Sequence, residues 1–317
     1  MTIHNIIDIS PIYHRFAYKM RLGNGTDIPI MYFVLREVER LREDAESRGA
    51  RVTTSACFDS KANLRKQFIK TEESEEYKSG RKSILTEEDF KDIETMKQIM
   101  SDSGINIMVK EGCEADDIMA KVAVHYNEQF ALSILYSTDK DIMVNIQDGI
   151  GMRRLTNGVW RSISQANFSA EAEGAFKVTM PYNALGMYLS TVGDSADKIP
   201  GIKKFGPKAF EKMILKINSD VNFTKLIDYD NVAVALKIAY SKGALTEEQF
   251  KQAVESYNMV RNINIIDDRN KQPSVEDIGD GFKKISVGME LPSILKISNT
   301  NSRVAAYTNA GMKSLAK

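Results

Sequence analysis

The stretch INIMVKEGCEADDIMAKVAVHY, residues 105–126, decides the expected fold. Residues 105–109 alternate in the manner of a strand. The apolar residues that follow recur at the three-to-four spacing of a helix buried on one side: Ala115, Ile118, Met119, Val122 and Tyr126. Between the two patterns stand three carboxylates, Glu114, Asp116 and Asp117. They are therefore expected at the carboxyl edge of a parallel sheet, where α/β proteins place their ligands.

A second acidic cluster follows one helix length later, in FALSILYSTDKDIM. Residues 130–136 predict a buried strand, and Asp139 and Asp141 come directly after it. Two carboxylates about 4 Å apart repel by roughly 4 kcal/mol near a protein surface, so converging acids need a compensating cation. A single Asp at a helix start is more often a cap than a ligand, but two clusters on successive strand ends favour a site for Mg²⁺ or Mn²⁺.

Composition excludes several classes of protein. The chain has 317 residues, 43% of them hydrophobic and 27% charged, and this length allows one large or two modest domains. Neither a membrane span nor a secretory signal is visible, so a cytoplasmic protein is expected. The formal net charge of zero argues against coating nucleic acid by bulk charge. Cys57 and Cys113 are expected to be small buried fillers in a reducing compartment.

Two further acids lie on predicted strands nearer the start of the chain. Asp8 interrupts the apolar run at residues 5–9, where an acid is costly unless it is used. A long amphipathic helix is predicted over Pro29–Gly49, and the β-rich run VTTSACFDS that follows it ends in Asp59.

Residues 61–82 alternate basic and acidic blocks, KANLRKQFIKTEESEEYKSGRK. Such a run is typical of a solvated, mobile segment, and the functional alternative is a lid that grips a nucleic-acid strand. The part from Lys70 to about Thr86 is expected to be poorly ordered without DNA. Thr86 followed by Asp89 predicts the start of the next helix.

The remaining signals lie beyond Asp141. Asn157 and Gly158 predict a hairpin, with Trp160 packing in it. In GDSADKIPGIKKFGPKAFEKMILKI, Asp194 and Asp197 precede a Gly- and Pro-rich turn and a predicted helix. Six lysines surround this turn: Lys198, Lys203, Lys204, Lys208, Lys212 and Lys216. The pattern favours a hairpin that binds the DNA backbone, and the alternative is an ordinary packing corner between helices.

EADD, STDKD and GDSADKIPGIKKFGPK on one chain resemble the flap endonuclease and 5′→3′ exonuclease family, especially the bacteriophage 5′ nucleases that include phage ribonuclease H. The resemblance runs from Asp8 to about Lys216. It includes an Arg-Phe pair seven residues after the first Asp, an FD strand end and a Tyr-Lys-x-x-Arg run. These motifs correspond here to Arg15-Phe16, Phe58-Asp59 and Tyr77-Lys78 with Arg81.

The resemblance implies an α/β fold: a PIN-like central, mostly parallel sheet flanked by helices, with a helical arch and a helix-three-turn-helix DNA-binding subdomain. Residues 1–180 would form the nuclease core, including the arch at about 61–103. Residues 181–317 would form a helical domain, with the helix-three-turn-helix at about 183–218 and a C-terminal extension of unassigned role.

The implied activity is two-metal hydrolysis of phosphodiester bonds in DNA, and of RNA primers in RNA–DNA hybrids, during replication. The first Mg²⁺ would be held by Asp8, Asp59, Glu114, Asp116 and Asp139. The second would be served by Asp117, Asp141, Asp194 and Asp197. Of the basic residues, Lys78 and Arg81 would act on the scissile phosphate, and DNA would also contact Arg15, Lys203, Lys204 and Lys208.

The resemblance also implies that Mn²⁺ can replace Mg²⁺ and that K⁺ binds the helix-three-turn-helix. The expected substrate is DNA with a 5′ overhang, flap or nick, and the expected partners are a single-strand-binding protein and a sliding clamp. A monomer in the cytoplasm, the host cytoplasm for a phage protein, is expected.

Two rival functions remain open on the residues alone. A phosphatase of the haloacid dehalogenase type would use Asp139 as nucleophile and Asp141 as general acid, but it leaves the lysine-rich turn without a role. A DNA-binding accessory protein without catalysis is the other alternative, although unused buried carboxylates are costly.

Overall fold

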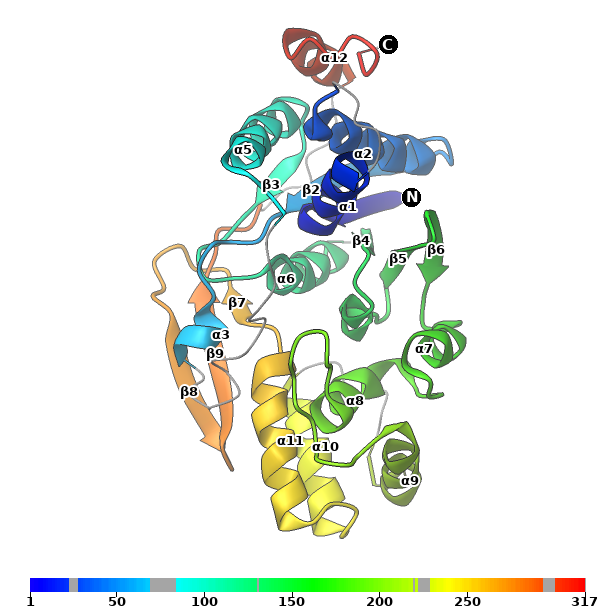
Figure 1. The fold of residues 1–317 in the computed structure, drawn as a ribbon, viewed down its shortest axis with the longest axis vertical. Helices are drawn as coiled ribbons and strands as arrows, with labels where there is room; N and C mark the ends of the chain where they lie inside the picture. Colours follow the sequence, from blue (N-terminus) through cyan, green and yellow to red (C-terminus); the bar gives the residue numbers. More distant parts are fainter. Residues whose placement is uncertain are drawn as a thin grey trace.

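A computed structural model of the chain describes residues 1–22, 28–68, 84–129, 131–218, 220–221, 229–292 and 300–316. Its centre is a six-stranded sheet in the order β3-β2-β1-β4-β5-β6 (Figure 1). Neighbouring strands run parallel from β3 to β5, and only β6 is antiparallel to its neighbour. The strands are β1 (Thr2–Asp8), β2 (Arg51–Cys57), β3 (Asn106–Met108), β4 (Leu132–Ser137), β5 (Ile150–Thr156) and β6 (Val159–Ile163). The expected α/β class with a mostly parallel sheet is confirmed.

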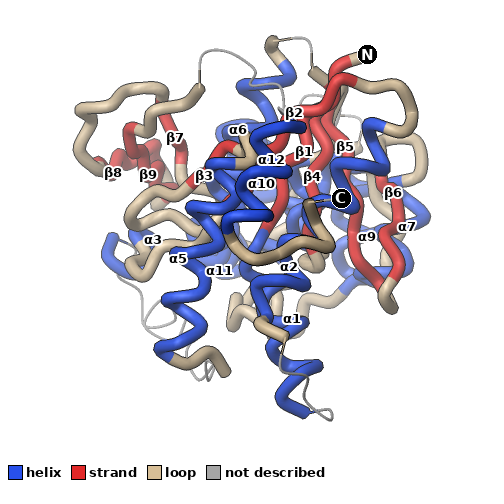
Figure 2. The backbone as a smooth tube through the Cα atoms, turned by 90° about the horizontal axis from the view of Figure 1, so that it is seen from above, coloured by secondary structure: helices blue, strands red, loops and turns tan. Residues whose placement is uncertain are grey.

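Helices cover the sheet because their apolar faces need burial. The helices of the first half are α1 (Ile9–Leu22), α2 (Ile30–Glu46), α3 (Leu64–Phe68), α5 (Glu87–Asp102), α6 (Ala115–Asn127) and α7 (Phe168–Phe176), with the 3-10 turn η1 (Asp141–Asn145). In the view from above, α1, α2 and α5 lie on one side of the sheet (Figure 2). The predicted Thr86–Asp89 capping box opens α5, and Asn157 and Gly158 form the predicted turn between β5 and β6.

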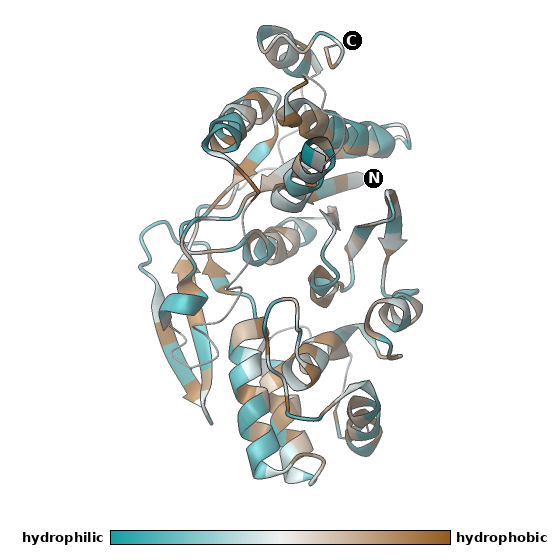
Figure 3. Cartoon of the chain, viewed as in Figure 1, coloured by the Kyte–Doolittle hydropathy of each residue, from teal (hydrophilic) through white to brown (hydrophobic). Residues whose placement is uncertain are grey.

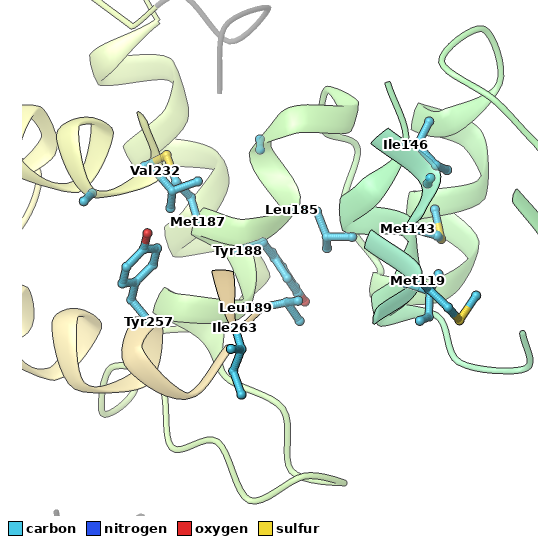
Figure 4. Close-up of a cluster of buried hydrophobic side chains, with 14 of the residues drawn as sticks. Met119, Met143, Ile146, Leu185, Met187, Tyr188, Leu189, Val232, Tyr257 and Ile263 are labelled. Carbon is cyan, nitrogen blue, oxygen red and sulfur yellow. The ribbon is translucent and has the colours of Figure 1, made fainter. Parts of the chain in front are cut away.

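The second half begins with a helical group below the sheet in Figure 1. It contains η2 (Tyr182–Ala184), α8 (Leu185–Val192), α9 (Pro207–Ile217), α10 (Tyr229–Ser241) and α11 (Glu247–Val260). The ribbon of α11 is mostly teal, the colour of hydrophilic residues, on the side away from α10 (Figure 3). Met119 of α6, Leu185 and Leu189 of α8 and Tyr257 of α11 belong to one buried cluster that joins this group to α6 (Figure 4).

The last part of the chain departs from the expected helical extension. It contains a three-stranded sheet of β7 (Asn264–Ile266), β8 (Ser274–Gly279) and β9 (Phe282–Gly288), in the order β7-β9-β8. Helix α12 (Thr300–Asn309) then returns to the first half and contacts α5. The prediction of a helical domain over residues 181–317 was therefore incomplete. Strands of three to seven residues without clear alternation of polar and apolar residues are hard to recognise from sequence. The division of the chain near residue 180 stays a prediction.

Candidate active site

Four of the predicted acids come from the carboxyl ends of adjacent parallel strands. Asp8 is the last residue of β1, while Asp59 and Asp139 stand two residues beyond β2 and β4. Because β1 lies between β2 and β4, these three acids meet at one edge of the sheet. Glu114 follows β3 and is the N-cap of α6, whose first residue Ala115 donates its N–H to Asp59 Oδ1 at 2.9 Å.

Asp8 has the environment expected of a buried ligand. It is 6% exposed, and its Oδ2 accepts a hydrogen bond of 2.9 Å from Ser137 Oγ. Its Oδ1 is buried and has no hydrogen-bond partner among the described residues. Burial, followed by the charge of Asp59 and those of Asp116 and Asp139, raises the pKa of Asp8 well above its ordinary value. A carboxylate in this position gains most from a bound cation.

The same edge offers oxygen atoms close enough for an ion. Carboxylate oxygens of Glu114, Asp116 and Asp117 lie within 4.8 Å of one another. A cavity of about 40 Å³, room for one ion with very little water, lies beside them. Four predicted acids line it: Asp116, Asp139, Asp141 and Asp197. An all-oxygen donor set of this kind fits Mg²⁺ or Mn²⁺.

Asp141 and Asp194 lie together on the side of η1 and the loop after α8. Burial, and then the charge of Asp139, raise the pKa of Asp141 to about 8. Burial also disfavours the charge of Asp194, but the N–H of Ala196 and Lys140 outweigh it and hold its pKa below the ordinary value. Lys140 Nζ is 3.1 Å from Asp194 Oδ2 and 4.0 Å from Asp141 Oδ1. The structure thus brings Asp141 and Asp194 together around a lysine, and Asp197 lines the same small cavity as Asp141.

Asp117 differs from the other acids. Its side chain is fully buried, and its oxygens accept hydrogen bonds from Arg65, from Ile263 N at 2.7 Å and from Glu114 N at 3.0 Å. Although its oxygens lie near those of Glu114 and Asp116, these protein donors already use both of them. These bonds hold the start of α6 in place, and the service of Asp117 to the second ion stays a prediction.

Sequence analysis missed three residues of this site. Ser137 and Lys140 flank Asp139 within the STDKD motif. Their closeness in sequence to Asp139 was the only feature that could have pointed to them. Arg65 was placed in the solvated basic run, and this was wrong: its side chain is 4% exposed and bonds Glu114 and Asp117. Charge patterning reports average exposure, so it cannot single out one arginine that folds inward.

The predicted DNA contacts lie apart from the acids or outside the described residues. Lys203, Lys204 and Lys208 are exposed around the start of α9, and Arg15 lies on α1 with its guanidinium 5.5 Å from the Phe16 ring centroid. The turn before α9 is tight: a Cβ at Gly201, where φ is +63°, would be 2.5 Å from the backbone of Val192. The segment that carries Lys78 and Arg81 lies outside the described residues. None of the described helices is long and apolar enough to span a membrane.

Comparison with known proteins agrees with this geometry. The family model of the 5′-3′ exonuclease N-terminal resolvase-like domain matches residues 4–173, just over half of the chain. Flap endonuclease Xni of Shewanella sediminis is 26% identical over 200 residues, which cover 63% of this chain and 74% of that protein. A 5′-3′ exonuclease of Buchnera aphidicola is 29% identical over 176 residues, 55% of each chain.

A solved structure of bacteriophage T5 flap endonuclease, a pseudo-enzyme-product complex with DNA and metal ions, shares the fold with a TM-score of 0.51. The match covers 80% of this chain and 92% of that one at 19% identity. These similarities support a nuclease over the phosphatase and the non-catalytic alternatives. With its acids at adjacent strand ends and the family model across its core, the chain belongs to the 5′-3′ exonuclease family with the N-terminal resolvase-like domain.

Proposed function

We propose that this protein is a Mg²⁺-dependent, structure-specific 5′ nuclease that acts on DNA as a 5′→3′ exonuclease and flap endonuclease, and on RNA primers in RNA–DNA hybrids. The observation that carries the proposal is the buried Oδ1 of Asp8, which has no hydrogen-bond partner among the described residues and is acted on by the charges of Asp59, Asp116 and Asp139. A cation would stabilise the ionised form of such a group, and the all-oxygen surroundings favour a hard one.

Two sets of acids would hold two ions, with Mn²⁺ able to replace Mg²⁺. Bound ions supply an activated water and charge stabilisation for the leaving oxygen. The first set is Asp8, Asp59, Glu114, Asp116 and Asp139, and the second is Asp117, Asp141, Asp194 and Asp197. Ser137 fixes Asp8 by its hydrogen bond, and Lys140 offsets the charge of Asp141 and Asp194. Lys78 and Arg81 would draw the scissile phosphate toward these acids.

Duplex DNA would lie along the turn before α9. Gly206 is the N-cap of α9 and Pro207 its first residue, so the positive dipole of this helix start is available to a phosphate. Lys203, Lys204 and Lys208 are exposed around it and would add charge without reading bases. K⁺ binding at this turn and a DNA contact by Arg15 are parts of the same proposal.

The unpaired strand would pass through a cavity of about 730 Å³ beside Asp59. Its wall includes the rings of Phe58 and Phe90, over which Lys97 and Lys61 place their ammonium groups at 5.0 and 5.8 Å from the centroids. Phe90 is 45% exposed, so its ring can stack on a base, and the lysines attract phosphates; this lining suits a single strand of any sequence.

The protein would act as a monomer in the cytoplasm, with a single-strand-binding protein and a sliding clamp as partners in replication. The decisive experiment incubates the purified protein and Mg²⁺ with 5′-labelled duplexes that carry flaps or 5′ overhangs, and in parallel with a generic phosphate ester. Release of labelled 5′ products without ester hydrolysis is expected. Hydrolysis of the ester alone would support the phosphatase, and binding without cleavage would support the accessory protein.

A further inference from the structure

Arg65 joins three segments that are far apart in the sequence. It lies in the short helix α3 and is 3% exposed. Its Nη1 donates to Glu114, its Nη2 to Asp117, and its Nε to the carbonyl oxygen of Arg261 at 3.1 Å. The fixed fork of the guanidinium therefore ties the start of α6, which carries the acids, to the residues just after α11.

The run 261–263 makes two further contacts with the acid-bearing elements. Ile263 donates its N–H to Asp117 Oδ1 at 2.7 Å, so backbone groups on both sides of residue 262 bond the Arg65–Asp117 ion pair. Asn262 Nδ2 donates to Asn145 Oδ1 at 3.1 Å, and Asn145 ends η1, which begins at Asp141. Asn262 also lines the small cavity between the acids. One tripeptide thus contacts the supports of both acidic sets.

We propose that Arg65 and the run Arg261–Ile263 form a positioning strut that sets the relative places of α6 and η1. In this proposal the strut acts by positioning the acids and takes no part in the reaction itself. It rests on the proposed nuclease function and gives the C-terminal part of the chain a role in it. Residues 261–263 lie beyond the 4–173 span of the family model, so this chain would use its own C-terminal part to hold an acidic site of the shared fold.

The physical reason is the burial of Asp117. A fully buried carboxylate must be paired and hydrogen-bonded, and Arg65 together with the two N–H groups provides this. Loss of one donor would let the first turn of α6 shift. Glu114 and Asp116 stand on that turn, so the shift would weaken metal binding and leave DNA binding nearly unchanged. Partners that orient metal ligands typically change metal affinity or activity by about 10- to 100-fold when they are removed.

The test uses two mild variants of the full chain. Arg65→Lys keeps the charge but loses the fork and the Nε donor, and Asn262→Ala removes the bond to Asn145 and one side chain of the cavity lining. Mn²⁺ binding is measured by calorimetry without DNA, and turnover is measured on a flap substrate. Each variant is expected to raise the half-saturating Mn²⁺ concentration and lower kcat about tenfold, with KM for DNA within about twofold. Excess Mn²⁺ should restore part of kcat.

Arg42→Lys is the matched control, because Arg42 is 1% exposed and donates to the carbonyl oxygen of Ser103, with no bond to a predicted acid of the site. It is expected to lower thermal stability and to leave the Mn²⁺ midpoint unchanged. The strut is refuted if Arg65→Lys and Asn262→Ala fold and bind Mn²⁺ as the wild type does, or if they change stability only, like the control. Wild-type Mn²⁺ binding without any DNA cleavage would instead refute the nuclease function and leave the strut standing.

Discussion

At the scale of single residues, Asp139 separates catalysis from binding most clearly. It is exposed at the end of β4, and its Oδ1 accepts only a backbone bond of 2.9 Å from Asp141 N among the bonds described. Asp139→Ala is expected to abolish cleavage of a flap substrate while duplex binding stays within a few-fold, because lysines elsewhere hold the phosphates.

A gel-based cleavage assay and a binding titration in Ca²⁺ check this expectation. Asp148→Ala, at an exposed turn before β5, is the control and should retain full activity. Chelation should stop the wild type, and Mg²⁺ or Mn²⁺ but not the larger Ca²⁺ should restore it. Turnover by Asp139→Ala, or full activity in excess chelator, would contradict the metal site.

A buried histidine gives the protein a pH-dependent stability that is independent of the acids. His4 Nε2 lies 2.9 Å from Ser55 Oγ, and its ring stacks on Tyr126 at 3.7 Å between centroids. Burial, and to a smaller extent His125, lower the pKa of His4 to about 3. In the unfolded chain His4 binds a proton below about pH 6.5, whereas in the folded chain it stays neutral down to about pH 3. The free energy of unfolding therefore falls as the pH drops from about 6.5 toward 3.

The expected slope from His4 alone approaches 1.4 kcal/mol per pH unit below its unfolded pKa. Urea unfolding of the wild type and of His4→Asn between pH 5 and 7.5 measures it by difference. This comparison removes the opposite effect of Asp8, whose raised pKa favours the folded state at low pH. If the free energy of unfolding depends on pH in the same way in the wild type and in His4→Asn, His4 is not held neutral in the folded protein.

At the scale of elements, the turn before α9 should bind duplex DNA through charge alone. Changing Lys204 and Lys208 together to Ala is expected to weaken binding similarly for all sequences and to lower the salt slope by about one to two units. Fluorescence anisotropy at several salt concentrations measures both quantities. Lys237 and Lys251, which pair with Asp280 and Glu247, provide the matched double-Ala control. A loss confined to certain sequences would mean that the turn reads bases.

At the scale of the whole molecule, α12 should stabilise the first half of the chain. Arg303 Nη1 is 3.0 Å from Glu39 Oε1, and Tyr307 donates to Glu39 Oε2 at 3.1 Å. Both partners of the Arg303–Glu39 pair are 10% exposed, so Arg303→Met should lower the free energy of unfolding by about 2–3 kcal/mol.

Urea unfolding measures this loss, and Arg269→Met serves as the control. Arg269 pairs with Glu290 at the surface, where both side chains are more than half exposed, and its loss should cost at most about 0.5 kcal/mol. An equal cost for the two variants would show that α12 is only loosely associated with α2. Mn²⁺ binding should be unchanged in Arg303→Met.

The sequence by itself determined the local elements and the strand ends that carry acids. Alternation and helical spacing around residues 105–126 predicted β3 and α6, and the Thr86–Asp89 box predicted the start of α5, because these signals depend on neighbours a few residues apart. A parallel strand places its carboxyl end at one edge, so the positions of Asp8 and Asp59 followed from the strand pattern.

Only the tertiary structure decided which charged side chains are buried and which groups form hydrogen bonds with them. Arg65 stands in a charged run and Ile263 more than a hundred residues beyond α6, yet both donate to Asp117. Burial and hydrogen bonding of this kind depend on segments that meet only after folding, and no local period encodes them. The same reason applies to β7–β9 and to the return of α12, whose partners lie in other parts of the chain.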